Sequence, residues 1–134
     1  MPTEVHVNDV QVAPGDKIGI TLPATSAYVA VLRTAAAGVA ARMEFTLDDV
    51  QDLRMLVDEA CAVLLPSAVP GSGLQAEFDV DPEGLDVSVR VNTGGPWEPP
   101  NDSFAWMVLT TLADPVDVST TNGQVTISFR KKHE

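Results

Sequence analysis

Two adjacent carboxylates, Asp58 and Glu59, lie inside an otherwise apolar run that extends from Val57 to Leu65. The run closes a long helical pattern, and an acidic pair in apolar surroundings is a natural place to look for chemistry. On a helix, Glu59 and Val63 are four residues apart and share a face. A catalytic or metal site on that face needs polar groups at both positions, and this chain offers one. The stretch therefore has the form of half an active site.

The other reactive side chains are few. Cys61 is the only cysteine, so an intrachain disulfide, a paired-cysteine redox motif and a cysteine-based zinc site are all excluded. We interpret it as a small core residue. His6 and His133 lie near the ends and have no partner in the sequence, so we assign them no role.

The composition is that of one ordinary globular domain of 134 residues, with 45% hydrophobic and 20% charged residues. The net charge of -11 argues against a nucleic-acid partner, because phosphate contacts need a basic face. It is compatible with docking on a basic protein, although solubility alone explains it equally well. No apolar run approaches a membrane span and the start does not have the form of a signal peptide, so we expect a cytoplasmic protein without membrane contact.

Hydrophobic periodicity divides the chain into an N-terminal arm, residues 1–16, and a single domain, residues 17–134. Thr46 caps the second helix, which continues until shortly before Pro66. Asn122-Gly123 is a strong hairpin signal. The expected strands cover residues 17–22, 74–80, 85–91, 116–119 and 125–131, and the expected helices cover residues 26–43, 46–65 and 103–113. This order predicts an α+β fold, a two-layer α/β sandwich in which a mostly antiparallel sheet carries about three helices on one face.

Four segments, residues 20–33, 52–61, 87–94 and 108–116, together resemble the RsbW-type anti-sigma factors. These are small bacterial serine kinases with the histidine-kinase-like ATPase fold. The resemblance extends from about Ile18 to Arg130, and the sequence around Ser103 to Trp106 is similar to the divergent actinobacterial branch of the family. The resemblance implies the fold, a site for Mg·ATP, and protein partners.

The family's second helix carries a Glu that is the presumed general base, followed four residues later by an Asn that holds Mg²⁺. Glu59 matches the Glu. Val63 stands at the Asn position and cannot ligate a hard cation, so we expect no metal site. Without a metal, Glu59 is either a vestigial base or a helix-surface acid paired with Arg54 or Arg33.

The nucleotide boxes of the family are also altered. Asn92 replaces the acid that accepts from adenine, and Gly94 matches the first glycine of that box, whereas Pro96 stands at the second. Ser103 and Ala105 occupy two glycine positions of the phosphate box, where a Cβ crowds the backbone approach to phosphate. We expect Mg·ATP binding to be weak or absent and kinase activity to be lost.

The function that the resemblance implies is an anti-sigma factor. It would sequester an RNA polymerase sigma factor and release it when an anti-anti-sigma protein competes for the same surface. Arg33 matches a family arginine that contacts both partners, and a homodimer through the first strand and first helix is expected. Two alternatives remain open. One is an active serine kinase with Glu59 as base and ATP between Asn92 and the helix at Ser103. The other is a degenerate ATPase-fold module with a different protein partner.

Overall fold

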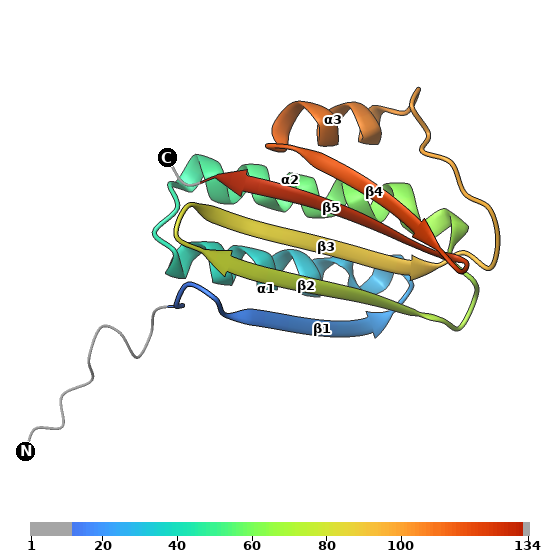
Figure 1. Cartoon of the computed structure of the whole chain (residues 1–134), viewed down its shortest axis with the longest axis horizontal. Helices are drawn as coiled ribbons and strands as arrows, with labels where there is room; N and C mark the ends of the chain where they lie inside the picture. The colour runs from blue at the N-terminus through green and yellow to red at the C-terminus, as the bar shows by residue number, and fades with distance from the viewer. Residues whose placement is uncertain (1–11, 133–134) are drawn as a thin grey trace, which may run out of the picture.

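The structure, a computed structural model, describes residues 12–132, so most of the predicted N-terminal arm and both histidines lie outside the described residues. Five strands and three α-helices follow one another along the chain (Figure 1). The elements are β1 (Lys17–Pro23), α1 (Val29–Arg42), α2 (Leu47–Leu64), β2 (Gly73–Asp81), β3 (Gly84–Asn92), α3 (Phe104–Leu112), β4 (Val116–Thr121) and β5 (Gln124–Lys132).

The strands form one sheet in the order β1-β2-β3-β5-β4, and every neighbouring pair is antiparallel. Apolar and polar residues alternate along β2, β3 and β5, so one face of the sheet is buried and the other is polar. Asn122 and Gly123 both have positive φ angles and connect β4 to β5, as the Asn-Gly signal predicts.

Helices α1 and α2 cover the apolar face of the sheet, and α3 packs against α2 beside β4 (Figure 1). The Thr46 side chain accepts a hydrogen bond from the backbone N–H of Asp49 at 3.1 Å and so caps α2. Small residues on α1 are buried, which allows the close approach of α1 to its neighbours; they are Ala36, Ala37 and Ala40. The predicted two-layer α+β sandwich is therefore confirmed.

Most element ends differ from the prediction by one residue, and three differences have a clear structural basis. Residues Ser26–Tyr28 form a separate 3-10 turn, so the α-helical part of the first helix begins only at Val29. Ser103 caps α3 rather than belonging to it, and β4 continues to Thr121 because the turn needs only Asn122 and Gly123. Each difference concerns the end of an element and leaves the order of elements unchanged.

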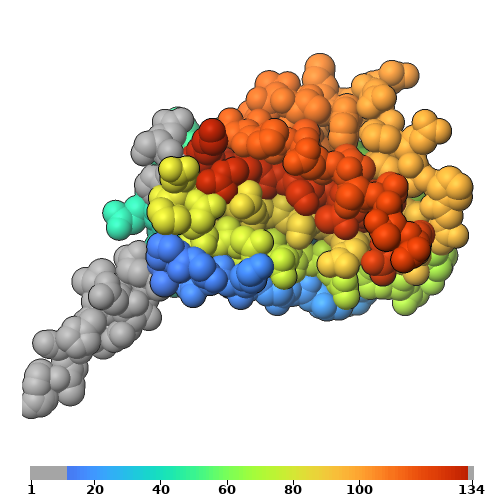
Figure 2. Space-filling view, viewed as in Figure 1, coloured from blue at the N-terminus to red at the C-terminus, as the bar shows by residue number. Residues whose placement is uncertain are grey.

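Among residues 12–132, no helix covers the opposite face of the sheet, and Figure 2 looks onto its five strands. Arg130 of β5 reaches across this face and forms two hydrogen bonds with the carboxylate of Asp81, at 2.6 and 3.0 Å, and one with Asp86 at 3.1 Å. At the end of β5, the buried Lys131 ammonium lies 3.2 Å from the carboxylate of Asp52 and 3.9 Å from that of Asp49, both on α2. These contacts fix the register of the turn and of α2 against the sheet.

Candidate functional site

The residues predicted for the nucleotide boxes meet in part at one cavity of about 480 Å³ beside the C-terminal end of α2. Val63 contributes from α2, Pro96 from the loop after β3, and Ser103 and Ala105 from the start of α3. The remaining described residues of the lining are Ala62, Pro66, Ser67, Trp97, Glu98 and Pro100. Sequence reasoning had placed Val63, Pro96, Ser103 and Ala105 at one site, and the fold brings these four together.

The Ser103 side chain caps the N-terminus of α3. The Ser103 hydroxyl accepts a hydrogen bond from the backbone N–H of Trp106 at 3.1 Å, and the Ser103 carbonyl accepts from Met107 N–H at 3.2 Å. A free helix N-terminus is an anion site because its N–H groups are unpaired. Here the Ser103 hydroxyl accepts from one of these N–H groups, that of Trp106, and so competes with a phosphate for it.

The charge of the cavity is acidic. Glu98 is the only charged residue among the described residues that line it, and no Lys or Arg is among them. Trp97 and Ala105 are half-buried and also pack against the hydrophobic core. The cavity therefore combines apolar walls with one carboxylate, which is unfavourable for a triphosphate.

Asn92 and Gly94 lie at the base of the same loop but do not line the cavity. The Asn92 side chain accepts a hydrogen bond from the backbone N–H of Gly94 at 2.9 Å. The backbone N–H groups of Thr93 and Gly94 both donate to the carbonyl of Gly123, at 2.7 and 3.2 Å. The side-chain oxygen of Asn92, at the position where the family accepts from adenine, thus closes a local turn. The backbone of that turn is bonded to the β4–β5 hairpin.

The two adjacent acids on α2, Asp58 and Glu59, have different surroundings. The Arg33 guanidinium on α1 forms an ion pair with Asp58, with 2.6 Å between Nη1 and Oδ1. Arg33, one of the two arginines suggested as a partner for Glu59, therefore pairs with Asp58 instead, because α1 packs beside the face of α2 that carries Asp58. Glu59 is half-buried and is not among the residues that line the 480 Å³ cavity.

A second, more apolar cavity of about 530 Å³ lies between the start of α1 and the C-terminal half of α2. Asp58, Cys61 and Val29 are among its lining residues, and it shares Ala62 and Pro66 with the first cavity. Burial, and then the charge of Asp58, raise the pKa of the Cys61 thiol to about 12. The thiol is protonated at neutral pH, as expected for the predicted core residue.

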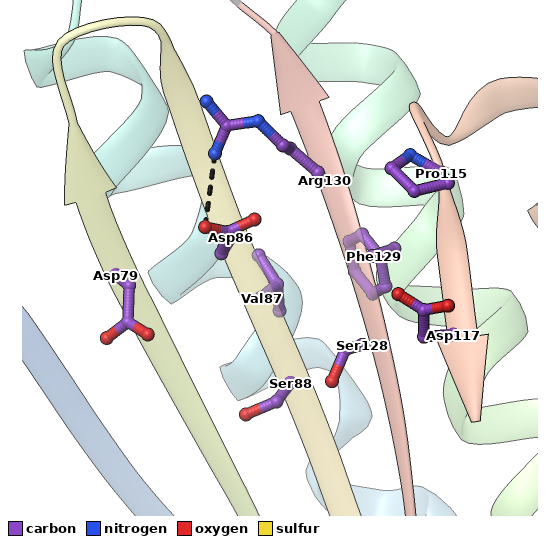
Figure 3. Close-up of a pocket in the computed structure, with 9 residues that line it drawn as sticks. All are labelled: Asp79, Asp86, Val87, Ser88, Pro115, Asp117, Ser128, Phe129 and Arg130. Atoms are coloured by element: carbon purple, nitrogen blue, oxygen red, sulfur yellow. Dashed lines mark hydrogen bonds and ion pairs between the residues drawn. The ribbon is translucent and has the colours of Figure 1, made fainter. Parts of the chain in front are cut away.

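A shallow hollow of about 250 Å³ lies on the open face of the sheet, where aspartate and serine side chains gather on neighbouring strands (Figure 3). Asp79 and Asp86 come from β2 and β3, and Asp117 from β4. Arg130 bonds Asp86 at the upper end of the hollow in this view. Among residues 12–132, no group of three or more His, Cys, Asp or Glu side chains is placed to hold a metal ion.

No family model matches the chain. Over 53 residues it is 42% identical to the serine-protein kinase RsbW of Bacillus thuringiensis (strain Al Hakam), and equally to the proteins of that name from Bacillus cereus (strain B4264) and Bacillus anthracis (strain A0248). The match spans 40% of this chain and 33% of the length of each of these curated relatives.

The fold has a solved counterpart. A crystal structure of the RsbU and RsbW domains of a Mycobacterium tuberculosis protein aligns with a TM-score of 0.71 at 15% identity, covering 90% of this chain and 33% of that one. The fold is therefore that of an RsbW domain. Together with the 42% sequence match, it confirms the predicted resemblance to RsbW-type proteins.

Of the lining residues, Glu98 had no predicted role, whereas the sequence suggested that Trp97 either seals a pocket or packs, with packing favoured. Their segment, residues 92–102, contains three prolines and two glycines, and without periodicity it could be interpreted only as a loop. A tryptophan inside such a loop was the available signal, because large aromatic side chains rarely stay fully in water.

Among the described residues, no helix is long and apolar enough to span a bilayer.

Proposed function

We propose that this chain is an anti-sigma factor that acts by binding rather than by phosphorylation. The observation that carries the proposal is an RsbW-type fold and sequence combined with a cavity that has no basic lining residue among those described. Val63 stands at the family's metal position, and Ser103 caps the helix that would hold phosphate. Affinity for Mg·ATP is lost because the charge of the triphosphate has no counterpart in the cavity.

The sigma factor binds on α1, around Arg33. The Arg33 guanidinium is half-exposed and is held in place by Asp58. It can therefore donate hydrogen bonds to a carboxylate of the partner, in addition to Asp58 or in its place. Tyr28 and Val31, nearby in the chain, are 41% and 50% exposed, which is unusual for large apolar residues on one short segment. A charged anchor beside exposed apolar side chains suits a protein interface.

Release follows from competition. An anti-anti-sigma protein binds an overlapping surface on α1, so that the two partners exclude each other. The chain forms a homodimer through β1 and α1. β1 is an edge strand that pairs only with β2 within residues 12–132, and such an edge favours pairing with a second chain.

Calorimetric titration of the purified chain with the sigma factors of its host tests the proposal. We expect saturable binding and repression of transcription in a reconstituted polymerase assay. Arg33→Ala should weaken binding at least about tenfold, as loss of a charged interface anchor does. Arg54→Ala, on the exposed side of α2, removes the same charge and should leave the affinity unchanged. Full affinity in the Arg33 variant would exclude α1 as the binding surface.

The competing function is an active serine kinase, which the name of the relatives favours. In that case Glu59 would activate a serine of the anti-anti-sigma partner. Incubation with radiolabelled Mg·ATP and that partner separates the two functions. Phosphate transfer that is lost in Glu59→Gln would establish the kinase. Absence of any sigma factor from a pull-down would instead favour a degenerate ATPase-fold module with another protein partner.

A further inference from the structure

We propose that the 480 Å³ cavity between α2 and α3 is a binding site for small organic cations with an apolar, aromatic body. The volume falls within the range of small-molecule pockets, about 300–1,000 Å³. The lining that argues against ATP is the same one used here, but binding of a sigma factor on α1 does not require a ligand in this cavity, and the ligand class differs from that of a nucleotide pocket. The inference therefore stands independently of sigma binding.

The walls of the cavity are suited to hydrocarbon. Seven of the ten lining residues are apolar: Ala62, Val63, Pro66, Pro96, Trp97, Pro100 and Ala105. Five of the seven are proline or alanine, which lose almost no side-chain entropy when a ligand covers them. Trp97 adds a large aromatic surface, on which a flat ring or an alkylated ammonium group can pack. A ligand with an apolar body is favoured over one that is polar throughout.

Polar atoms in the lining select the sign of the ligand's charge. Besides Glu98, the polar residues in the lining are Ser67 and Ser103. The Ser103 hydroxyl already accepts a hydrogen bond from Trp106 N–H. Trp97 and Glu98 follow one another in the chain and both line the cavity, so a bound cation can be attracted by the aromatic ring and by the carboxylate charge. The net charge of -11 adds a long-range field of the same sign.

The same features exclude phosphorylated ligands. One backbone donor at the start of α3, the N–H of Trp106, is engaged by Ser103, and none of the ten lining residues is basic. A nucleotide would place three or four negative charges beside Glu98. The cavity thus disfavours ATP, the ligand of the ATPase fold in other proteins, and favours a cation.

A charge series of equal size tests the inference: 1-naphthylmethylamine, 1-naphthalenemethanol and 1-naphthoate. The full chain, labelled with ¹⁵N, is titrated with each probe, and amide shifts are followed by NMR. We expect saturable shifts at Trp97, Ala62 and Ala105, with dissociation constants of about 1 mM or tighter for the cation, as suits a ligand of this size. The amine should bind about fivefold more tightly than the naphthoate, as one solvent-exposed ion contact gives.

Two charge variants make the test specific. Glu98→Gln should remove the preference for the amine and leave naphthalenemethanol binding unchanged. Glu83→Gln removes the same charge from the β2–β3 turn, at the opposite end of the sheet from the cavity, and should retain the preference (Figure 1). Ala105→Leu should weaken all three probes, because it fills the cavity.

Three results would overturn the inference: no saturable binding of any probe, naphthoate binding as tight as the amine, or shifts that map away from the cavity. ATP is titrated in parallel, and ATP binding tighter than the amine would overturn it as well. Sigma binding is measured on the same sample. The cavity is tested by Glu98→Gln and the α1 surface by Arg33→Ala, so a failure of this site can be distinguished from a failure of the anti-sigma proposal.

Discussion

At the residue scale, Val63 decides most about the chemistry. It is 6% exposed and belongs both to the hydrophobic core and to the lining of the cavity. A metal-binding amide at this position would need partners for its polar atoms, and the neighbouring walls are largely apolar. A valine at this position therefore suits its surroundings better than an amide would.

Val63→Asn should therefore fail to restore ATP binding, since Ser103, Ala105 and Glu98 still oppose phosphate. It should also lower the free energy of unfolding by about 1–3 kcal/mol, because it buries an amide among apolar groups. Urea unfolding and calorimetric titration with Mg·ATP measure the two effects. Micromolar ATP binding by this single variant would show that the metal position alone had silenced the site.

Asp81 is the residue through which stability depends on acid pH. Its hydrogen bonds from Arg130, and then those from the backbone N–H groups of Glu83 and Gly84, lower the pKa of the carboxyl from 3.8 to about 2. The folded state therefore binds this proton less readily than the unfolded state. The stabilisation is complete above the unfolded value of 3.8 and is lost as the pH falls toward 2.

Asp81→Asn should lower the free energy of unfolding at pH 7 by about 1 kcal/mol, the value for a partly exposed ion pair after screening by solvent. The difference between the variant and the parent chain should shrink between pH 4 and pH 2. Asp102→Asn, in the loop before α3, serves as a charge control and should show a pH-independent difference near zero. A constant difference for Asp81→Asn down to pH 2 would contradict the assignment.

At the element scale, the β2–β3 hairpin depends on a close approach to β5. A Cβ built on Gly84 would lie 2.6 Å from the carbonyl oxygen of Lys131 and 3.0 Å from the Cα of Lys132. Both are backbone atoms held in the β3–β5 ladder, in which Gly84 pairs with Lys132. The strands can be this close only because position 84 has no side chain.

Gly84→Ala should lower the free energy of unfolding by about 1–3 kcal/mol, as overpacking against fixed atoms does. Gly38→Ala is the matched control within α1, where the added Cβ meets nothing within 4 Å. It should raise the free energy of unfolding by about 0.5–1 kcal/mol, because alanine favours helix interiors over glycine. Chemical unfolding followed by tryptophan fluorescence measures both variants. Equal effects of the same sign would refute the packing argument.

Periodicity and turn chemistry were enough to predict the elements of this fold. Alternation identified β2, β3 and β5, and Thr46 marked the start of α2, because each signal is local. The contact between Arg33 and Asp58 was not predictable in the same way. Choosing Asp58 over its neighbour Glu59 requires the relative rotation of α1 and α2, which is set by packing. Glu98 was missed as a wall of the cavity, and packing was favoured over pocket lining for Trp97, because a proline-rich loop has no period.

At the scale of the whole molecule, the net charge of -11 governs how partners approach. A basic partner surface should be steered to the chain through the summed field, which acts over about a Debye length and is screened by salt. The charge affects the encounter more than the final contacts, which lie on α1 in our proposal.

The association rate constant for the sigma factor should therefore fall at least about tenfold between roughly 0.05 M and 0.5 M NaCl. The dissociation rate constant should change much less, since buried contacts are screened less than exposed ones. Stopped-flow fluorescence of the tryptophans gives the association rate, and displacement by unlabelled chain gives the dissociation rate. A salt-insensitive association rate would mean that the acidic charge serves solubility alone.

The Gly123 carbonyl has a consequence for motion. It accepts the backbone N–H groups of both Thr93 and Gly94, so the chain leaves the sheet after β3 and comes back to the same point at the β4–β5 turn. Residues 93–123 are thus a closed loop with tied ends, and its closure entropy is already offset by local bonds. Such a loop can open and reclose as a sub-global unit. Amide protons of the loop and of α3 should then exchange with deuterium together, ahead of those of β2 and β3, and a ligand in the cavity should slow that exchange.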